Sequence, residues 1–122
     1  MSDKRILYVE DNEDNVYMLK RRLERKGYTV EVAVTGEEGV DMVLASPPDL
    51  VLMDLSLPGI DGWEAITRIR AELGKELPII ALSAHAMEQH IKQALDAGAD
   101  DFDSKPVELK RLLGKISQQL GE

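Results

Sequence analysis

The sequence predicts an α/β domain in which a parallel β-sheet carries helices on both faces. Five strand-like segments alternate with five helical ones from end to end, which is typical of parallel sheets. Several strand-like segments are unbroken apolar runs, as expected for strands covered on both faces. At 122 residues the chain has the size of one domain, so we expect a single domain over residues 1–122.

The first third of the chain predicts two strands and a helix. Residues 6–9 form an apolar run, and residues 13–26 place apolar side chains at the helical period, with Gly27 as the stop signal. In residues 28–33 apolar and polar side chains alternate instead. A period of two indicates a strand with one face less buried, so we expect this strand at an edge of the sheet.

The middle of the chain predicts a helix and a buried strand. Thr35 and Glu38 have the spacing of a capping box, which predicts a helix over residues 35–44. Two prolines at residues 47–48 break the chain, and residues 50–53 form a second unbroken apolar run.

The second half of the chain completes the alternation. Helical periodicity predicts helices over residues 61–73, 87–97 and 109–120. The apolar residues 78–82 predict a strand, and residues 101–104 predict the fifth strand although their composition is polar.

The charge balance argues against several classes of function. The chain has 15 Lys and Arg residues against 23 Asp and Glu, a formal net charge of −8. Proteins that bind nucleic acid or anionic membranes normally present basic faces, so we expect neither kind of partner.

The absence of cysteine excludes disulfides, thiol catalysis and thiolate metal sites. The apolar run at residues 6–9 is too short for a signal peptide or a membrane span, and we expect a cytoplasmic protein.

Polar side chains follow four of the five predicted strands. Glu10 and Asp11 come after the first strand, Asp54 after the third, Ser83 after the fourth and Lys105 after the fifth. Ligands of open α/β sheets bind outside the carboxyl ends of the strands, so we expect these side chains at one rim. If the strand order is 2-1-3-4-5, the first and third strands are neighbours and their three carboxylates converge.

Converging carboxylates need a counter-charge, because two of them about 5 Å apart repel by roughly 3 kcal/mol at an effective dielectric constant of about 20. Mg²⁺ removes this repulsion, and proteins commonly hold it with one or two carboxylates together with phosphate oxygens. Lys105 adds a positive charge and Ser83 a hydroxyl donor. These groups suit phosphoryl transfer and suggest that an aspartate accepts the phosphoryl group.

Four segments together resemble the signature of response-regulator receiver domains. They are ILYVEDN at residues 6–12, LMDLSLPGIDG at 52–62, ALSA at 81–84 and KP at 105–106. The resemblance covers essentially the whole chain, in order and with the family's spacing. It implies a flavodoxin-like (βα)5 fold, with a five-stranded parallel sheet of order 2-1-3-4-5 and helices on both faces.

By this resemblance, Asp54 is the phosphoacceptor of the domain. Asp11 and Asp54 bind Mg²⁺, the backbone carbonyl of Ser56 completes the protein ligands, and Glu10 acts through a water molecule. Lys105 pairs with the phosphoryl group, and its peptide bond to the following proline is expected to be cis.

Ser83 and Phe102 resemble the family's switch pair. The hydroxyl moves toward the phosphoryl group and the aromatic ring swings inward behind it. The output face would then be formed by the fourth helix, the fifth strand and the fifth helix. Ser56 and His85, each two residues after a site residue, resemble the positions that tune hydrolysis of the aspartyl phosphate.

The resemblance implies a phosphorylation switch whose donor is a histidine kinase or a histidine phosphotransfer protein. It would catalyse its own phosphorylation and dephosphorylation without conventional enzymatic turnover. No output domain fits after Glu122, so we expect signalling through a downstream protein or onward phosphorelay, by a monomer or a weak phosphorylation-dependent dimer. Residues 81–87 also resemble receivers fused to hybrid kinases, which leaves an excised domain as an alternative.

Two other classes of protein fit the same residues less well. A Mg²⁺-dependent phosphohydrolase with an aspartyl intermediate needs a second acid two residues after the nucleophile, where this chain has Ser56. A flavin-binding electron carrier needs a neutral phosphate cradle after the first strand. Residues 10–14 are acidic there and would repel an anionic cofactor.

Overall fold

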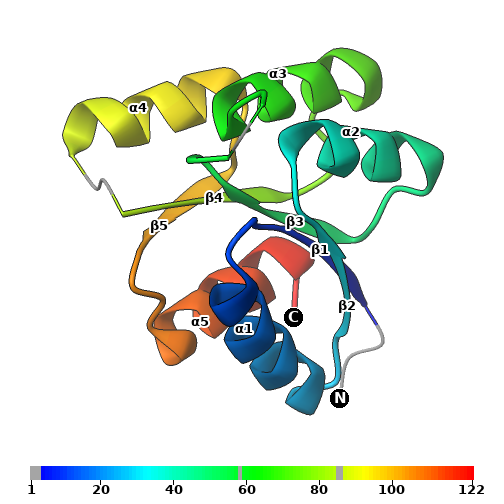
Figure 1. The fold of residues 1–122 in the computed structure, drawn as a ribbon, viewed down its shortest axis with the longest axis vertical. Helices are drawn as coiled ribbons and strands as arrows, with labels where there is room; N and C mark the ends of the chain where they lie inside the picture. The colour runs from blue at the N-terminus through cyan, green and yellow to red at the C-terminus, as the bar shows by residue number, and fades with distance from the viewer. Residues whose placement is uncertain (1–3, 58, 85–86) are drawn as a thin grey trace.

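Five parallel strands form one sheet in the computed structural model, which describes residues 4–57, 59–84 and 87–122 (Figure 1). The strand order is β2-β1-β3-β4-β5, as the resemblance implies. The strands are β1 (Arg5–Val9), β2 (Thr29–Ala33), β3 (Leu50–Asp54), β4 (Ile79–Ser83) and β5 (Asp101–Ser104). The helices are α1 (Glu13–Arg25), α2 (Gly36–Ala45), α3 (Gly62–Leu73), α4 (Glu88–Ala97) and α5 (Leu109–Leu120). These elements confirm the predicted alternation, with ends that shift by one residue at most.

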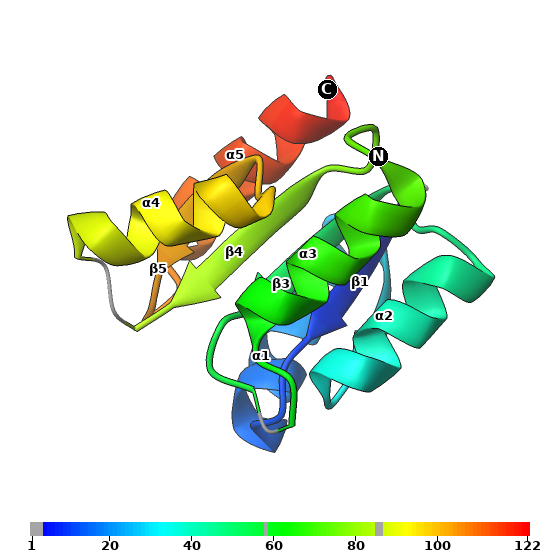
Figure 2. The same ribbon diagram turned by 90° about the horizontal axis from the view of Figure 1, so that it is seen from above.

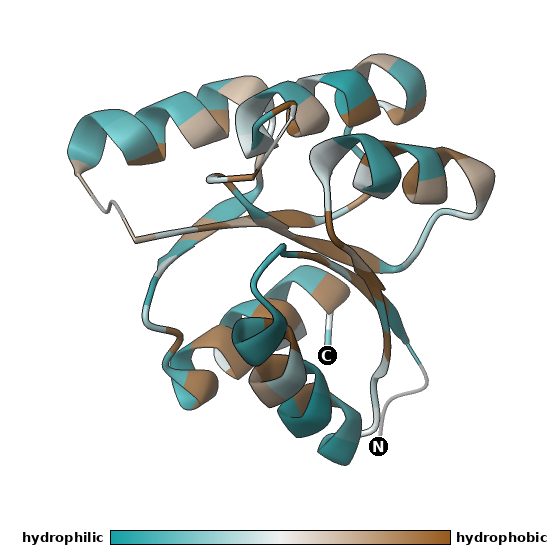
Figure 3. Cartoon of the chain, in the orientation of Figure 1, coloured by the Kyte–Doolittle hydropathy of each residue, from teal (hydrophilic) through white to brown (hydrophobic). Residues whose placement is uncertain are grey.

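Helices cover both faces of the sheet, as predicted. α1 and α5 lie on one face, and α2, α3 and α4 lie on the other (Figures 1 and 2). Successive strand side chains point to opposite faces, so Leu7 and Val9 join the core under α2–α4 while Ile6 and Tyr8 join the core under α1 and α5. β3 and β4 are buried at every position, and Figure 3 shows hydrophobic residues concentrated along the central strands.

β2 forms one edge of the sheet, which confirms the interpretation of its alternating pattern. Thr29 is exposed, whereas Val30 is buried. The helix that follows begins as predicted, because Thr35 Oγ1 accepts a hydrogen bond from the N–H of Glu38 at 3.0 Å. Among the helices of the described residues, none is long and apolar enough to cross a membrane.

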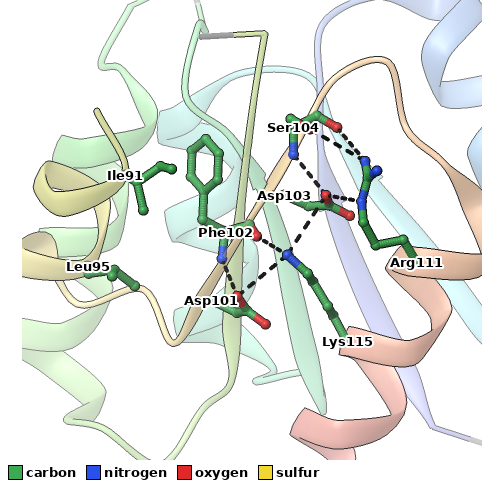
Figure 4. A pocket seen from close by; sticks show the side chains of 8 residues that line it. All are labelled: Ile91, Leu95, Asp101, Phe102, Asp103, Ser104, Arg111 and Lys115. Atoms are coloured by element: carbon green, nitrogen blue, oxygen red, sulfur yellow. Dashed lines mark hydrogen bonds and ion pairs between the residues drawn. The ribbon is translucent and has the colours of Figure 1, made fainter. Parts of the chain in front are cut away.

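β5 forms the other edge, and its polar side chains bond its own backbone (Figure 4). Asp101 Oδ1 accepts from the N–H of Phe102 at 2.8 Å, and Asp103 Oδ1 accepts from the N–H of Ser104 at 2.9 Å. Open backbone groups on an edge strand invite pairing with another chain. The polar composition of β5 therefore has a structural reason, which is to cover this edge.

Two basic residues of α5 cover the carbonyl groups of the same edge. Lys115 Nζ donates to the carbonyl of Phe102, and Arg111 Nη2 donates to that of Ser104 at 3.4 Å. Arg111 Nε also lies 2.7 Å from Asp103 Oδ1. We call Asp101, Asp103, Arg111 and Lys115 the edge cluster; it lines a pocket of about 340 Å³ that α4 borders on its other side.

Candidate functional site

The carboxyl ends of β1 and β3 bring three carboxylates together. The two strands are paired with Val9 opposite Met53, so Glu10 and Asp54 are the next pair along. Carboxylate oxygens of Glu10, Asp11 and Asp54 all lie within 4.8 Å of one another. Glu10 and Asp54 are 1% and 3% exposed, whereas Asp11 is open to solvent. The structure thus brings together the three acids that the sequence placed at one rim.

Lys105 provides the counter-charge that the sequence analysis expected. Its Nζ lies 2.7 Å from Glu10 Oε1 and 3.1 Å from Asp54 Oδ2. Burial opposes the charge on the ammonium group, but the two carboxylates outweigh it and raise the pKa of Lys105 above its ordinary value. The peptide bond between Lys105 and Pro106 is cis, in agreement with the resemblance. We call Glu10, Asp11, Asp54 and Lys105 the rim site.

Glu10 is held by further donors that the sequence analysis did not identify. The Tyr8 hydroxyl donates to Glu10 Oε1 at 3.2 Å, and the side-chain amide of Asn15 donates to the same oxygen at 3.5 Å. The N–H of Asn12 donates to Oε2 at 3.3 Å. Burial, followed by the charge of Glu10, raises the pKa of Tyr8 far above its ordinary value, so the phenol keeps its proton. The period of two places Tyr8 and Glu10 on one face of the sheet, and this was the signal available in the sequence.

Asp54 is fixed by its own loop and by the start of α3. Its Oδ1 accepts from the N–H of Ser56 at 3.0 Å. A Cβ atom at Gly62 would collide with the backbone carbonyl of Asp54 and would lie 2.7 Å from the Leu55 Cα. Glycine at this position therefore lets α3 pack directly against the backbone that carries the Asp54 carboxylate.

Ser83 and Phe102 occupy different surroundings. Ser83 is 2% exposed at the end of β4, and its carbonyl accepts from the N–H of Lys105 at 2.8 Å, which places it at the rim. Phe102 is 7% exposed, and its ring belongs to the core under α2–α4, beside Ile91 (Figure 4). The ring thus already lies inside the core in this structure. His85 falls outside the described residues.

The donor set of the rim site fits Mg²⁺. Three carboxylates within 4.8 Å of one another supply hard oxygen ligands. Two of them are buried, while Asp11 opens the site to solvent. This arrangement leaves room on one side for the water or phosphate oxygens that Mg²⁺ keeps as ligands.

The sequence of the chain matches a known protein family. The sequence profile described as "Response regulator receiver domain" matches residues 6–117. The chain belongs to this family. It is therefore a receiver domain of two-component signalling, and receivers bind Mg²⁺ in an acidic pocket and interact with histidine kinases or phosphotransfer proteins.

Two curated relatives are longer than this chain. The response regulator MprA of Mycolicibacterium vanbaalenii is 38% identical over 112 residues, which are 92% of this chain and 48% of that protein. The transcriptional regulatory protein DltR of Streptococcus agalactiae is 39% identical, over 92% of this chain and 50% of that protein. The chain spans about half the length of these relatives, so the charge argument against nucleic acid bears on this domain alone.

Two solved structures share the fold over nearly the full chain. A response regulator from Chloroflexus aurantiacus has a TM-score of 0.93 at 33% identity and covers 99% of this chain and 100% of that one. The receiver domain of a sensor histidine kinase from Pseudomonas aeruginosa, with a magnesium ion coordinated in its active site cleft, has a TM-score of 0.91 at 34% identity and the same coverage. These likenesses confirm the flavodoxin-like receiver fold that the sequence predicted.

Proposed function

We propose that this receiver is switched by phosphorylation of Asp54, with a phosphohistidine of a histidine kinase or phosphotransfer protein as the donor. The observation that carries the proposal is the contact between a nearly buried aspartate and a lysine beside two further acids. Asp54 Oδ2 lies 3.1 Å from Lys105 Nζ, and Glu10 and Asp11 complete the carboxylate cluster. An aspartate in this setting combines a nucleophilic oxygen with nearby charge stabilisation.

In the proposed reaction an oxygen of the Asp54 carboxylate attacks the phosphorus atom. The phosphorus–nitrogen bond of the donor breaks, and its electron pair stays on the imidazole nitrogen. Lys105 turns its ammonium group from the carboxylates to the phosphoryl oxygens, which carry the transferred charge. Mg²⁺ held by the acidic cluster would further neutralise the charge of those oxygens. Loss of the phosphoryl group to water would reset the switch.

We assign the metal to the acidic cluster and to one backbone carbonyl. Asp11 and Asp54 would bind Mg²⁺ together with the carbonyl of Ser56, and Glu10 would act through a water molecule. The N–H of Ser56 already bonds Asp54 Oδ1 at 3.0 Å, which keeps this loop residue beside the acceptor. Ser56 and His85 are the proposed positions that tune the lifetime of the aspartyl phosphate.

We further propose that Ser83 and Phe102 carry the signal to the face formed by α4, β5 and α5. Phe102 touches both helices, because its ring lies beside Ile91 of α4 while its carbonyl accepts from Lys115 of α5. A shift of Ser83 toward the phosphoryl group would be followed by a change in this packing. The readout would be a downstream protein or onward phosphorelay, with the receiver as a monomer or a weak phosphorylation-dependent dimer.

The test is intact-mass measurement after incubation with acetyl phosphate, with and without Mg²⁺. The wild-type chain is expected to gain one Mg²⁺-dependent, hydroxylamine-labile phosphoryl adduct. Asp54→Asn is expected to gain none, whereas Asp41→Asn, an exposed aspartate on α2, gains it as the wild type does. An adduct that survives in Asp54→Asn would overturn the assignment of the acceptor.

A further inference from the structure

Tyr8 is a buried group beneath the rim site to which the proposed phosphoryl transfer gives no part. It lies on β1 and is 1% exposed, with its ring packed in the core under α1 and α5. Its hydroxyl is the polar end of an otherwise apolar side chain, and it reaches Glu10 Oε1 at 3.2 Å. A phenylalanine ring would pack in this core as well as the tyrosine ring does. The contact of the hydroxyl with Glu10 therefore points to a role for the hydroxyl beyond packing.

The same carboxylate oxygen is also the contact point of Lys105. Lys105 Nζ lies 2.7 Å from Glu10 Oε1, closer than either Tyr8 or the Asn15 amide. A divalent cation among the carboxylates repels the Lys105 ammonium group and weakens this contact. Glu10 is 1% exposed, so, apart from the water molecule that would join it to the metal, solvent has little access to replace the lost donor. A buried carboxylate that loses a donor is destabilised unless another donor remains.

We propose that Tyr8 is a positioning residue of the metal site, whose hydroxyl holds the Glu10 carboxylate in place when a bound cation repels Lys105 and weakens its contact with Glu10. This inference rests on the proposed function, because it takes Glu10 as part of the Mg²⁺ site. Tyr8 acts through Glu10 and does not itself touch the metal or the phosphoryl group. Asn15 reaches the same oxygen at 3.5 Å, so Tyr8 is the closer of the two neutral donors described for Oε1, while the N–H of Asn12 donates to Oε2.

The test compares two tyrosine-to-phenylalanine variants by Mg²⁺ titration calorimetry on the full chain. Tyr8→Phe removes the hydroxyl and keeps the ring in the core. It is expected to raise the dissociation constant of Mg²⁺ about fivefold, the effect of one modest hydrogen bond. Tyr28→Phe removes a hydroxyl that donates to the Glu122 carboxylate at 2.9 Å, at the other end of the sheet. This matched control is expected to leave Mg²⁺ binding unchanged.

A double-mutant cycle with Glu10→Gln separates positioning from a general effect on the fold. If Tyr8 acts through Glu10, Tyr8→Phe changes Mg²⁺ affinity in the wild-type background and has no further effect in Glu10→Gln. Unchanged or tighter binding by Tyr8→Phe would overturn the proposal, as would an equal loss in both backgrounds. The titration needs no phosphoryl donor, so failure of Asp54 to accept a phosphoryl group leaves this result readable on its own.

Discussion

Two regions of the molecule place a lysine between two acids, and they differ in what else those charges touch. In the rim site, Lys105 lies 2.7 Å from Glu10 and 3.1 Å from Asp54. In the edge cluster, Lys115 lies 3.7 Å from Asp101 and 3.9 Å from Asp103.

The edge cluster is tied to the backbone of β5. Asp101 and Asp103 accept from strand N–H groups, and Lys115 donates to the carbonyl of Phe102. The contacts described for Lys105 Nζ join it to carboxylates, which a cation or a phosphoryl group can engage instead. Charged side chains that bond a strand backbone stabilise the fold. Ion pairs between side chains can instead be replaced by contacts with a bound ligand. We therefore expect rim variants to change chemistry and edge variants to change stability.

The largest effect is expected from Asp11→Asn, which removes the exposed acid of the rim site. We expect Mg²⁺ affinity to fall about 100-fold, because a hard cation loses a charged oxygen ligand. The free energy of unfolding without metal should rise, because the substitution removes the repulsion between Asp11 and the two buried carboxylates beside it. Mg²⁺ titration calorimetry and urea unfolding measure the two quantities. Asp14→Asn, an exposed acid in the first turn of α1, is the control and should bind Mg²⁺ normally.

Gly62→Ala tests whether the rim site depends on close packing of α3. The added Cβ would collide with the backbone carbonyl of Asp54, so we expect a loss of about 2–3 kcal/mol in the free energy of unfolding. Gly114→Ala in α5 is the matched control, because, apart from its chain neighbours and the backbone of its own helix, no atom lies within 4 Å of the added Cβ. That variant should gain up to about 1 kcal/mol from helix propensity. Equal effects in urea unfolding would contradict the packing argument.

Arg111→Met tests the edge cluster with a smaller expected effect. The substitution leaves the buried carboxylate of Asp103 without its 2.7 Å partner. Since the Arg111 side chain is 43% exposed, water limits the loss to about 1–2 kcal/mol. Mg²⁺ affinity should not change. Lys110→Met, an exposed neighbour on α5, serves as the control in thermal unfolding. A change in Mg²⁺ affinity would show that the two clusters are coupled.

The sequence predicts the rim site well because the topology itself places strand ends together. Glu10, Asp54 and Lys105 each follow or end a strand, so the alternation, together with the strand order that the resemblance implies, was enough to bring them to one edge. The hydroxyl of Tyr8 was harder to assign, because its bond to Glu10 depends on side-chain conformation inside the core. The two-residue period of a strand places Tyr8 and Glu10 on one face of the sheet, but it does not require a hydrogen bond between them.

The polar strand β5 shows a second limit of sequence patterns. Polar residues usually count against a buried strand, yet Asp101 and Asp103 bond the backbone of β5 itself. Phe102 likewise gave no sign of whether its ring lies in the core or at the surface. The aspartate bonds depend on local side-chain conformation, whereas the position of the Phe102 ring depends on how the helices pack against the sheet edge.

The most direct test of the account compares Lys105→Met with Lys115→Met for the rate of Mg²⁺-dependent phosphoryl adduct formation from acetyl phosphate, followed by intact mass. Both variants remove an ammonium group that lies between two acids. Lys105→Met is expected to slow the reaction about 100-fold, the usual effect of losing one preorganised charge at a reacting group. Lys115→Met should react at close to the wild-type rate. Wild-type reactivity in Lys105→Met, or an equal loss in Lys115→Met, would contradict the claim that the rim site carries the chemistry while the edge cluster stabilises the fold.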